Sequence, residues 1–291
     1  MAKNLTLLER AYILAGVATE QPRYMEMDDM ERVKRGNYKT EYEVMGFRKL
    51  RTTYSNSSQL GEILKRAENL THPAIYRMPD NGGVTKIKGL HVKSSHMGDN
   101  PLYSKIVDMM CLDNAEKAAT ILDTDAVYVT QTKINSKLPG VGESWEWHTD
   151  FATWGPLDGI KTNNLLTLMI FIDDVTEENG PVRVIPQSHE IEYSTMKDSS
   201  AGYEMLCTPA HDVEMALDRV DGRIETLTGK AGDAYIFHSG LLHSSSVNES
   251  DKRRSILFIT YNSCYNRPWY FSPNRNYWQH SYNWNNILEN R

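Results

Sequence analysis

Apolar and polar residues alternate along several short stretches in the second half of the chain, and this pattern is typical of β-strands with one buried face. The clearest stretch is 126–135, and residues 165–173 form an almost uninterrupted apolar run of strand length. Shorter strands are expected at 182–186, 234–237 and 255–262. Turn signals separate them without alternating crossover helices, so the pattern favours a double-sheet β-sandwich or jelly roll over a parallel α/β sheet.

The first part of the chain has a different pattern. Residues 1 to about 75 are charged and mainly of helical periodicity, with an amphipathic helix expected at 5–17 and another at 57–67, which starts at a hydroxyl N-cap candidate. A capping-box pattern predicts a further helix over 113–122. Residues 84–92 alternate after a turn cluster and are compatible with either a strand or an ordered loop.

We find no internal repeat and no linker, and therefore expect a single domain over 1–291, mainly β with flanking helices (α+β). It would consist of a helical N-terminal layer at about 1–123, a jelly-roll core at about 84–265 and an aromatic-rich C-terminal tail at 266–291. Residues 188–225 are polar and irregular, which is typical of a surface excursion. The tail is expected either to cover a substrate or to pack against a sheet.

Composition narrows the class of protein. The chain has 291 residues, of which 40% are hydrophobic, and this is enough for a substantial core. A net charge of -6 gives no electrostatic reason to expect a nucleic-acid partner. We see no signal peptide and no apolar run near the ~20 residues that span a bilayer. The expectation is a cytoplasmic monomer or homodimer that acts on a small molecule. Three widely spaced cysteines predict neither a disulfide framework nor a cysteine zinc site.

An aromatic segment in the middle of the chain holds the strongest candidates for chemistry, His148 and Asp150. Two histidines and one carboxylate on one face of the metal are the usual ligands of mononuclear iron(II). On an extended strand, residues two apart point to the same face, so these two side chains can converge on one ion. His243 is the expected third ligand, and His238 is the alternative, either as a ligand or as a strand-end histidine bonded to the backbone.

Arg254 adds a candidate for anion binding. It follows His243 by 11 residues on the next strand, so it can return beside the metal and present its planar guanidinium to a carboxylate. The alternative is a solvated charge within the basic cluster 252–254. The hydroxyls of Ser245 and Thr167 are candidates to support the same carboxylate, unless they bond only to the backbone.

Five sequence blocks follow one another in a fixed order between residues 84 and 265. They are Gln131–Thr132–Lys133–Ile134–Asn135, Trp147–His148–Thr149–Asp150–Phe151 with Trp154, Asn179–Gly180–Pro181, Ile185–Pro186–Gln187–Ser188–His189, and His243–Ser244–Ser245 with Arg254. Together these blocks closely resemble the phytanoyl-CoA dioxygenase family, and within that family the ectoine hydroxylases and a free-proline 4-hydroxylase are nearest.

The resemblance implies a cupin-like double-stranded β-helix of jelly-roll type that uses iron(II), 2-oxoglutarate and dioxygen. It also implies oxidation of an aliphatic C–H bond in a free amino acid or small amino-acid-derived metabolite, with release of succinate and carbon dioxide. Hydroxylation is the simplest outcome. Oxidative cyclisation or desaturation in natural-product biosynthesis is the alternative within the class, and a non-catalytic jelly-roll binding protein is the alternative outside it.

The resemblance also implies roles for individual residues. The metal ligands would be His148, Asp150 and His243; the co-substrate would contact Arg254, Ser245, Lys133 and Thr167; and the substrate pocket would include Gln131 and Trp154. The chain departs from the ectoine hydroxylases at Ala152 and Leu157, where those enzymes carry acidic residues. A substrate other than ectoine is therefore expected.

Overall fold

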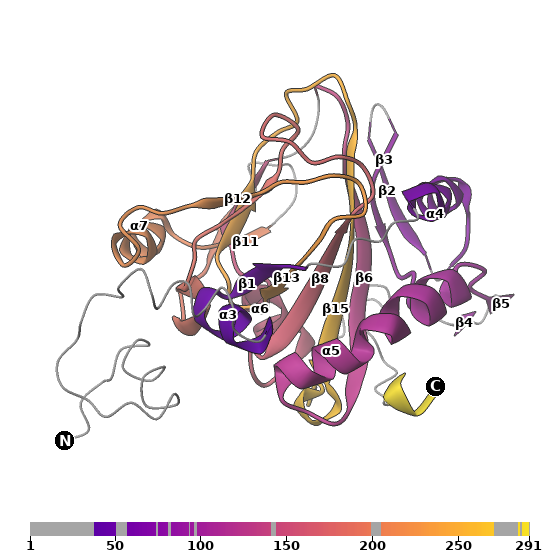
Figure 1. Ribbon diagram of the computed structural model, residues 1–291, viewed down its shortest axis with the longest axis horizontal. Helices are drawn as coiled ribbons and strands as arrows, with labels where there is room; N and C mark the ends of the chain where they lie inside the picture. The colour runs from indigo at the N-terminus through magenta and orange to yellow at the C-terminus, as the bar shows by residue number, and fades with distance from the viewer. Residues whose placement is uncertain are drawn as a thin grey trace.

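The computed structural model describes residues 38–50, 57–73, 75–80, 83–92, 94–95, 98–140, 144–198, 205–270, 285 and 287–290. The helix expected at 5–17 and the greater part of the C-terminal tail lie outside these ranges. Within them, two antiparallel sheets of unequal size enclose a core, and helices cover one outer face (Figure 1).

The larger sheet has seven strands, and every neighbouring pair in it is antiparallel. The β-branched and aromatic residues that predicted strands form its central members. In order across the sheet the strands are β1 (Phe47–Lys49), β13 (Ala234–His238), β8 (Leu165–Phe171), β15 (Arg254–Ser263), β6 (Val127–Lys137), β3 (Gly83–Lys88) and β2 (Tyr76–Asp80).

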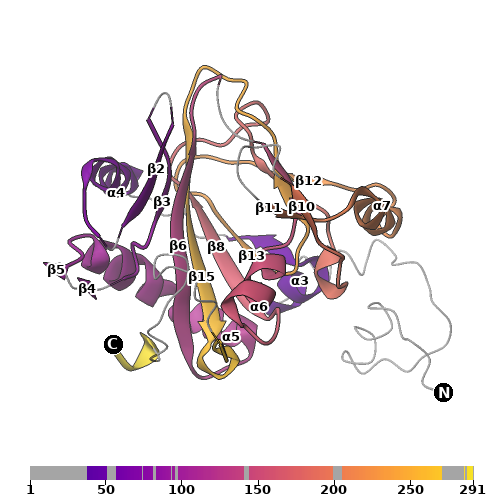
Figure 2. The same ribbon diagram turned by 180° about the vertical axis from the view of Figure 1, so that it is seen from behind.

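The smaller sheet has four short antiparallel strands and lies opposite part of the larger one (Figure 2). Its strands in order are β12 (Glu225–Leu227), β9 (Val182–Val184), β14 (His243–Ser245) and β7 (Trp145–His148). Two further hairpin-like pairs stand apart from both sheets, β4 (Ser94–Ser95) with β5 (Gly98–Asp99) and β10 (Met196–Asp198) with β11 (Met205–Cys207).

Helices before and between the strands complete the fold. They are α3 (Tyr38–Met45), α4 (Ser57–Asn69), the π-helix η1 (Ser104–Cys111), α5 (Leu112–Leu122), α6 (Phe151–Asp158) and α7 (Ala210–Asp218), with short 3-10 turns η2 (Ser188–Glu190), η3 (Cys264–Asn266) and η4 (Ile287–Asn290). The apolar sides of α4 and α5 pack on the outer face of the larger sheet. In the described part of the chain, no helix has the length and apolar character needed to cross a membrane.

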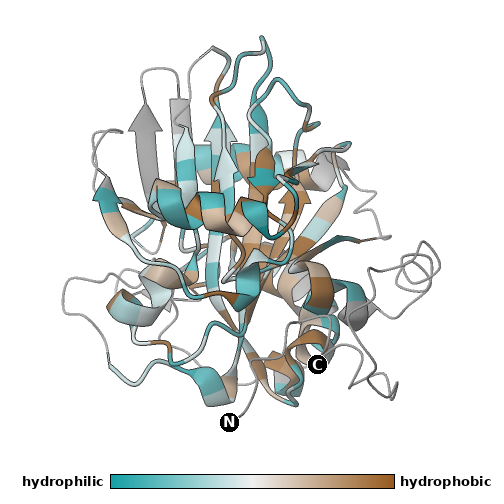
Figure 3. Cartoon of the chain, turned by 90° about the vertical axis from the view of Figure 1, so that its left-hand side faces the viewer, coloured by the Kyte–Doolittle hydropathy of each residue, from teal (hydrophilic) through white to brown (hydrophobic). Residues whose placement is uncertain are grey.

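Strand β8 shows how the sequence pattern builds this core. Successive strand residues point to opposite faces. Leu166, Leu168 and Ile170 accordingly pack towards the helices, whereas Met169 and Phe171 pack between the two sheets. Because both faces are covered, the strand is apolar throughout, which explains its uninterrupted run. Hydrophobic residues gather in the interior of the molecule, and the coloured loops at its upper end are mainly hydrophilic (Figure 3).

The strands expected from the pattern are confirmed, and 84–92 contains a strand, β3. Three expectations need correction. The N-terminal layer is not wholly helical, because β1 and the β2–β3 hairpin join the larger sheet. The segment 188–225 is not only a surface excursion, since it contains α7, whose apolar side packs beside Ile185 and Leu242. Asp113 is not the start of a helix, because the π-helix η1 ends at Cys111 and α5 begins at Leu112, so the two helical segments are continuous.

Candidate active site

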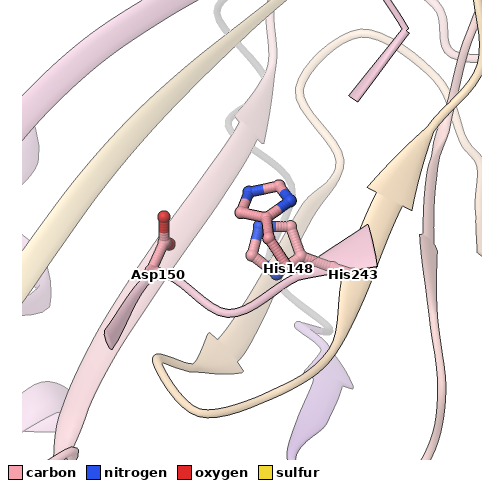
Figure 4. Close-up of side chains that lie close together, drawn as sticks. All are labelled: His148, Asp150 and His243. Carbon is pink, nitrogen blue, oxygen red and sulfur yellow. The ribbon is translucent and has the colours of Figure 1, made fainter. Parts of the chain in front are cut away.

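His148, Asp150 and His243 meet at the inner side of the smaller sheet. His148 is the last residue of β7 and His243 the first of β14, and the two are cross-strand partners. Their ring centroids lie 4.2 Å apart. One potential ligand atom from each of the three residues lies within 4.8 Å of the others. Figure 4 shows the two rings side by side with Asp150 next to them.

The convergence of His148 and Asp150 has a different cause from the one expected. The two do not share a strand, because β7 ends at His148 and Asp150 has helical dihedral angles (φ -61°, ψ -36°) at the N-cap of α6. The Thr149 hydroxyl accepts a hydrogen bond from the Ala152 amide at 3.2 Å and so stabilises this first turn. A strand end followed at once by a helical turn therefore carries the carboxylate back towards the histidine ring.

The backbone fixes which nitrogen each histidine presents. Nδ1 of His148 lies 2.7 Å from the Glu146 carbonyl oxygen, and Nδ1 of His243 lies 2.9 Å from the Leu241 carbonyl oxygen. A carbonyl only accepts, so each Nδ1–H donates and each Nε2 keeps its lone pair for a metal. Burial, aided by the neighbouring His243, lowers the pKa of His148 to about 3, so the ring is in the neutral, metal-binding form.

Asp150 supplies the negative charge of the triad. Burial by itself raises the pKa of this carboxyl, but Lys133, His243 and His148 together hold it below its usual value. Lys133 Nζ lies 3.8 Å from Oδ1. Oδ2 is buried and has no hydrogen-bond partner among the described residues. A buried oxygen left in this way fits a cation, and a donor set of two imidazoles and one carboxylate fits iron(II).

The triad faces a cavity of about 180 Å³ between the two sheets. The residues that line it come mainly from β3, β6, β7, β14 and β15, with Thr153 and Trp154 from α6. Gln131, Lys133, Asn135 and Lys137 all line it, since alternate residues of β6 point to one face.

Arg254 lies at another part of the same cavity and is 2% exposed, which argues against the solvated surface charge considered above. Its Nη2 donates to the Gly180 carbonyl, and its Nε is buried without a hydrogen-bond partner among the described residues. Burial lowers the pKa of the guanidinium to about 9. Its cross-strand partner is Lys137, whose Nζ donates to Ser245 Oγ at 2.8 Å. Two cations in one buried place fit a carboxylate such as the distal one of 2-oxoglutarate.

Thr167 is the one expected co-substrate residue that lies elsewhere. It sits in β8, fully buried, and its hydroxyl is 3.1 Å from that of Thr260 on β15. It is not among the described residues that line the cavity. Lys137 lies beside Arg254, and it is not among the residues predicted for the site. The alternation of β6 continues from Gln131 to Lys137, and following it to the strand end was the signal that could have found this lysine.

His238 is a strand-end histidine bonded to the backbone, the second of the two roles predicted for it. It closes β13, and its Nδ1 accepts a hydrogen bond from the Gly240 amide at 3.0 Å. Its ring lies 5.1 Å from that of His189, and within the described part of the chain it is not in the group that could hold a metal.

A jelly roll that brings two histidines, one aspartate and a buried arginine to a single cavity defines the class of non-haem iron, 2-oxoglutarate-dependent oxygenases. The family model for phytanoyl-CoA dioxygenase (PhyH) matches residues 42–256. The chain belongs to this family, which confirms the predicted family and enzyme class.

Curated relatives agree with this assignment. The chain is 41% identical over 154 residues to an L-proline trans-4-hydroxylase of Streptomyces griseoviridis, a match that covers 49% of this chain and 57% of that enzyme. It is 31% identical over 238 residues to an ectoine dioxygenase of Bordetella bronchiseptica, covering 77% of this chain and 74% of that enzyme.

The fold is also that of a solved relative. The apoform of EctD from S. alaskensis superposes with a TM-score of 0.66 at 24% identity, covering 84% of this chain and 82% of that one. This likeness confirms the predicted fold, a mainly β protein with a cupin-like double-stranded β-helix.

Proposed function

We propose that the protein hydroxylates an aliphatic C–H bond of a free amino acid or a small amino-acid derivative. The observation that carries the proposal is the presence, in one cavity, of the metal-binding triad and the buried Arg254–Lys137 pair. When bound, iron(II) with 2-oxoglutarate supplies the oxidation: one atom of dioxygen enters the C–H bond to give an alcohol, and the other enters succinate as carbon dioxide is lost.

The residues around the cavity then have separate tasks. His148, Asp150 and His243 would hold the iron, and the two backbone carbonyls that accept from the Nδ1–H groups would keep the rings oriented. Arg254 and Lys137, with Ser245, would bind the distal carboxylate of the co-substrate in a place closed to water. Lys133 would stand between the metal ligand Asp150 and the co-substrate.

The substrate class rests on the names of the relatives and on the shape of the site. One relative is named for L-proline and others for ectoine, and both are small amino-acid-type molecules. Trp154 is 3% exposed and packs with Phe151 and Ile160, so it forms a rigid wall of the cavity. Gln131 lines the cavity from β6 and offers an amide to a polar substrate group. The substrate carbon that is held close to the metal is the one that is oxidised.

The first test separates an oxygenase from a binding protein that lacks the chemistry. Anaerobic addition of iron(II) and 2-oxoglutarate should produce a visible metal-to-ligand charge-transfer band. His148→Ala should abolish the band, while His211→Ala, an exposed residue of α7, should leave it unchanged. If the intact protein gave no band, the metal and co-substrate assignment would be wrong.

The second test concerns the substrate and the outcome. Succinate formation should be measured across free amino acids and N-alkylated amino acids, and the products weighed by mass spectrometry. Hydroxylation adds one oxygen atom, whereas cyclisation or desaturation removes two hydrogen atoms. A protein that gives the band but releases succinate with none of these compounds would refute the amino-acid substrate and keep the oxygenase class.

A further inference from the structure

Helix α6 connects the metal site with one wall of the cavity, and its own sequence stabilises it only weakly. Its N-cap, Asp150, belongs to the candidate metal site, and Trp154 lines the cavity. The next two residues are Gly155 and Pro156, which are the two poorest helix formers. Proline also has no N–H to donate to the preceding turn. A helix of eight residues with this sequence depends on contacts with other parts of the chain.

The far end of α6 is held by residues 266–270, the first part of the aromatic tail, which we call the brace. The Trp269 amide donates to the carbonyl of Gly159, the C-cap of α6, at 3.0 Å. The Tyr270 hydroxyl donates to the Pro156 carbonyl. The brace thus satisfies carbonyls at the end of a helix, where donors within the helix run out.

The brace is itself fixed on both sides. The carboxamide of Asn266 accepts a hydrogen bond from the Thr162 amide and donates one to the Thr162 carbonyl, both at 3.0 Å. Its Nδ2 also donates to Oδ1 of Asn262 at 3.0 Å, near the end of β15. The brace therefore connects the larger sheet with the far end of α6 and with the loop that follows it.

Gly159 allows the brace to lie directly on α6. Its φ is +71°, a value that L side chains rarely adopt, and an added Cβ would overlap the Tyr270 carbonyl oxygen and lie 3.0 Å from Cδ1 of the ring. Gly222 has a similar φ of +74°, but no atom lies within 4 Å of a Cβ added there. The glycine at position 159 thus serves a close contact as well as a dihedral angle.

We propose that Tyr270 and Gly159 are positioning residues, which hold Trp154 in place against the substrate through the second half of α6. The start of the helix is fixed separately, because the Phe151 amide donates to the Ser239 carbonyl at 3.0 Å. Loss of the brace should therefore displace the wall formed by Trp154 and leave the metal site in place. The proposal rests on the proposed function, because it concerns how that same cavity holds its substrate.

Amide hydrogen exchange tests the brace itself. Tyr270→Phe removes one hydroxyl and keeps the ring. The amides of Gly159 and Ile160, whose hydrogen bonds close the last turn of α6, should exchange roughly 2- to 10-fold faster, the factor for one lost hydrogen bond. The Phe151 amide should exchange at its wild-type rate. Unchanged exchange at all three positions would overturn the proposal.

Kinetics separate a positioning role from a purely structural one. With the amino acid that gives the most succinate, Tyr270→Phe should raise the KM for that amino acid roughly 2- to 10-fold. Gly159→Ala should raise it by about 100-fold, since a displacement of about 1 Å has an effect of that size. Both variants should keep the wild-type KM for 2-oxoglutarate and the charge-transfer band with iron(II).

Tyr265→Phe and Gly222→Ala are the matched controls, and both should keep the wild-type KM values. Tyr265 is 71% exposed, and its hydroxyl donates to Asp125 at 2.9 Å. Faster exchange in Tyr270→Phe with an unchanged KM for the amino acid would overturn the positioning role and leave the proposed function standing. No succinate with any amino acid would refute the amino-acid substrate, and the exchange rates would then decide whether the brace holds α6.

Discussion

Replacing Arg254 with methionine should stabilise the protein without ligands and abolish its response to 2-oxoglutarate. The guanidinium is 2% exposed, and its Nε has no hydrogen-bond partner among the described residues. Burial lowers its pKa from 12.5 to about 9, which at ~1.4 kcal/mol per pKa unit corresponds to about 5 kcal/mol of destabilisation. The cost is fully present below about pH 9, where the side chain is charged in both the folded and the unfolded state.

Methionine removes this cost and also the repulsion from Lys137, its cross-strand partner. Against the gain stands the Gly180 carbonyl, which loses its donor at a cost of about 1 to 3 kcal/mol. The net expectation is a gain of roughly 2 to 4 kcal/mol, or roughly 4 to 8 °C in Tm for a chain of this size. The KM for 2-oxoglutarate should rise at least about 100-fold, since a buried charge pair contributes several kcal/mol to binding.

Differential scanning fluorimetry without ligands, and then with anaerobic iron(II) and 2-oxoglutarate, measures both effects. Arg253→Met is the matched control. Arg253 is the adjacent residue, is 37% exposed and pairs with Asp173 at 3.1 Å and Glu68 at 3.4 Å. Its loss should cost at most about 1 kcal/mol and leave 2-oxoglutarate binding intact. If Arg254→Met lowered the Tm and kept the shift with 2-oxoglutarate, the buried guanidinium would be a structural group and no anion site.

Two other substitutions test the surroundings of the site. Gly180→Ala should lower the free energy of unfolding, measured with urea, by about 2 to 4 kcal/mol, because Gly180 has φ +76° and an added Cβ would lie 2.7 Å from the Ser246 carbonyl oxygen. Gly222→Ala is the control: Gly222 has φ +74° but no atom within 4 Å of an added Cβ, so this variant should lose only about 1 kcal/mol. Burial lowers the pKa of His238 to about 3, so its contribution to stability is complete above about pH 6.5 and is lost as the pH falls towards 3. Between pH 7 and pH 5 the wild type should therefore lose about 2 kcal/mol more of its free energy of unfolding than His238→Asn, a variant that keeps an acceptor for the Gly240 amide. Equal losses in the two proteins would contradict the lowered pKa of His238.

The strands of the fold follow from the sequence because their side chains alternate, and alternation is a local property. Strand β6 and the two-sided apolar strand β8 could be placed within a few residues for this reason. The short strands were harder. β1 and β12 have three residues each, too few to show a period, and their place depends on pairing with β13 and β9 across long stretches of chain. Pairing partners far apart in sequence leave no local signal.

In the candidate site, too, some features follow from the local sequence and others only from the tertiary structure. The spacing of His148 and Asp150 predicted that they would converge, although the predicted cause, a shared strand, was wrong, because the helical turn of α6 begins between them. Thr167 lies on the strand expected for it, but its partner in the sheet, Thr260, takes up its hydroxyl. Only the register of β15 against β6 reveals that Lys137 stands opposite Arg254. Register is a tertiary property, and one residue of slip would reverse which side chains face the cavity.

The arrangement of charges also explains how one fold can separate the oxidation from the choice of substrate. The metal ligands come from β7, the start of α6 and β14, and the candidate co-substrate cations come from β15 and the end of β6. Lys86 and Lys88 line the cavity from β3, which pairs with β6 on one side and with the hairpin strand β2 on the other. No metal ligand and neither member of the Arg254–Lys137 pair belongs to β3. Substitutions on β3 can therefore change this wall of the cavity while the triad and the co-substrate site keep their geometry.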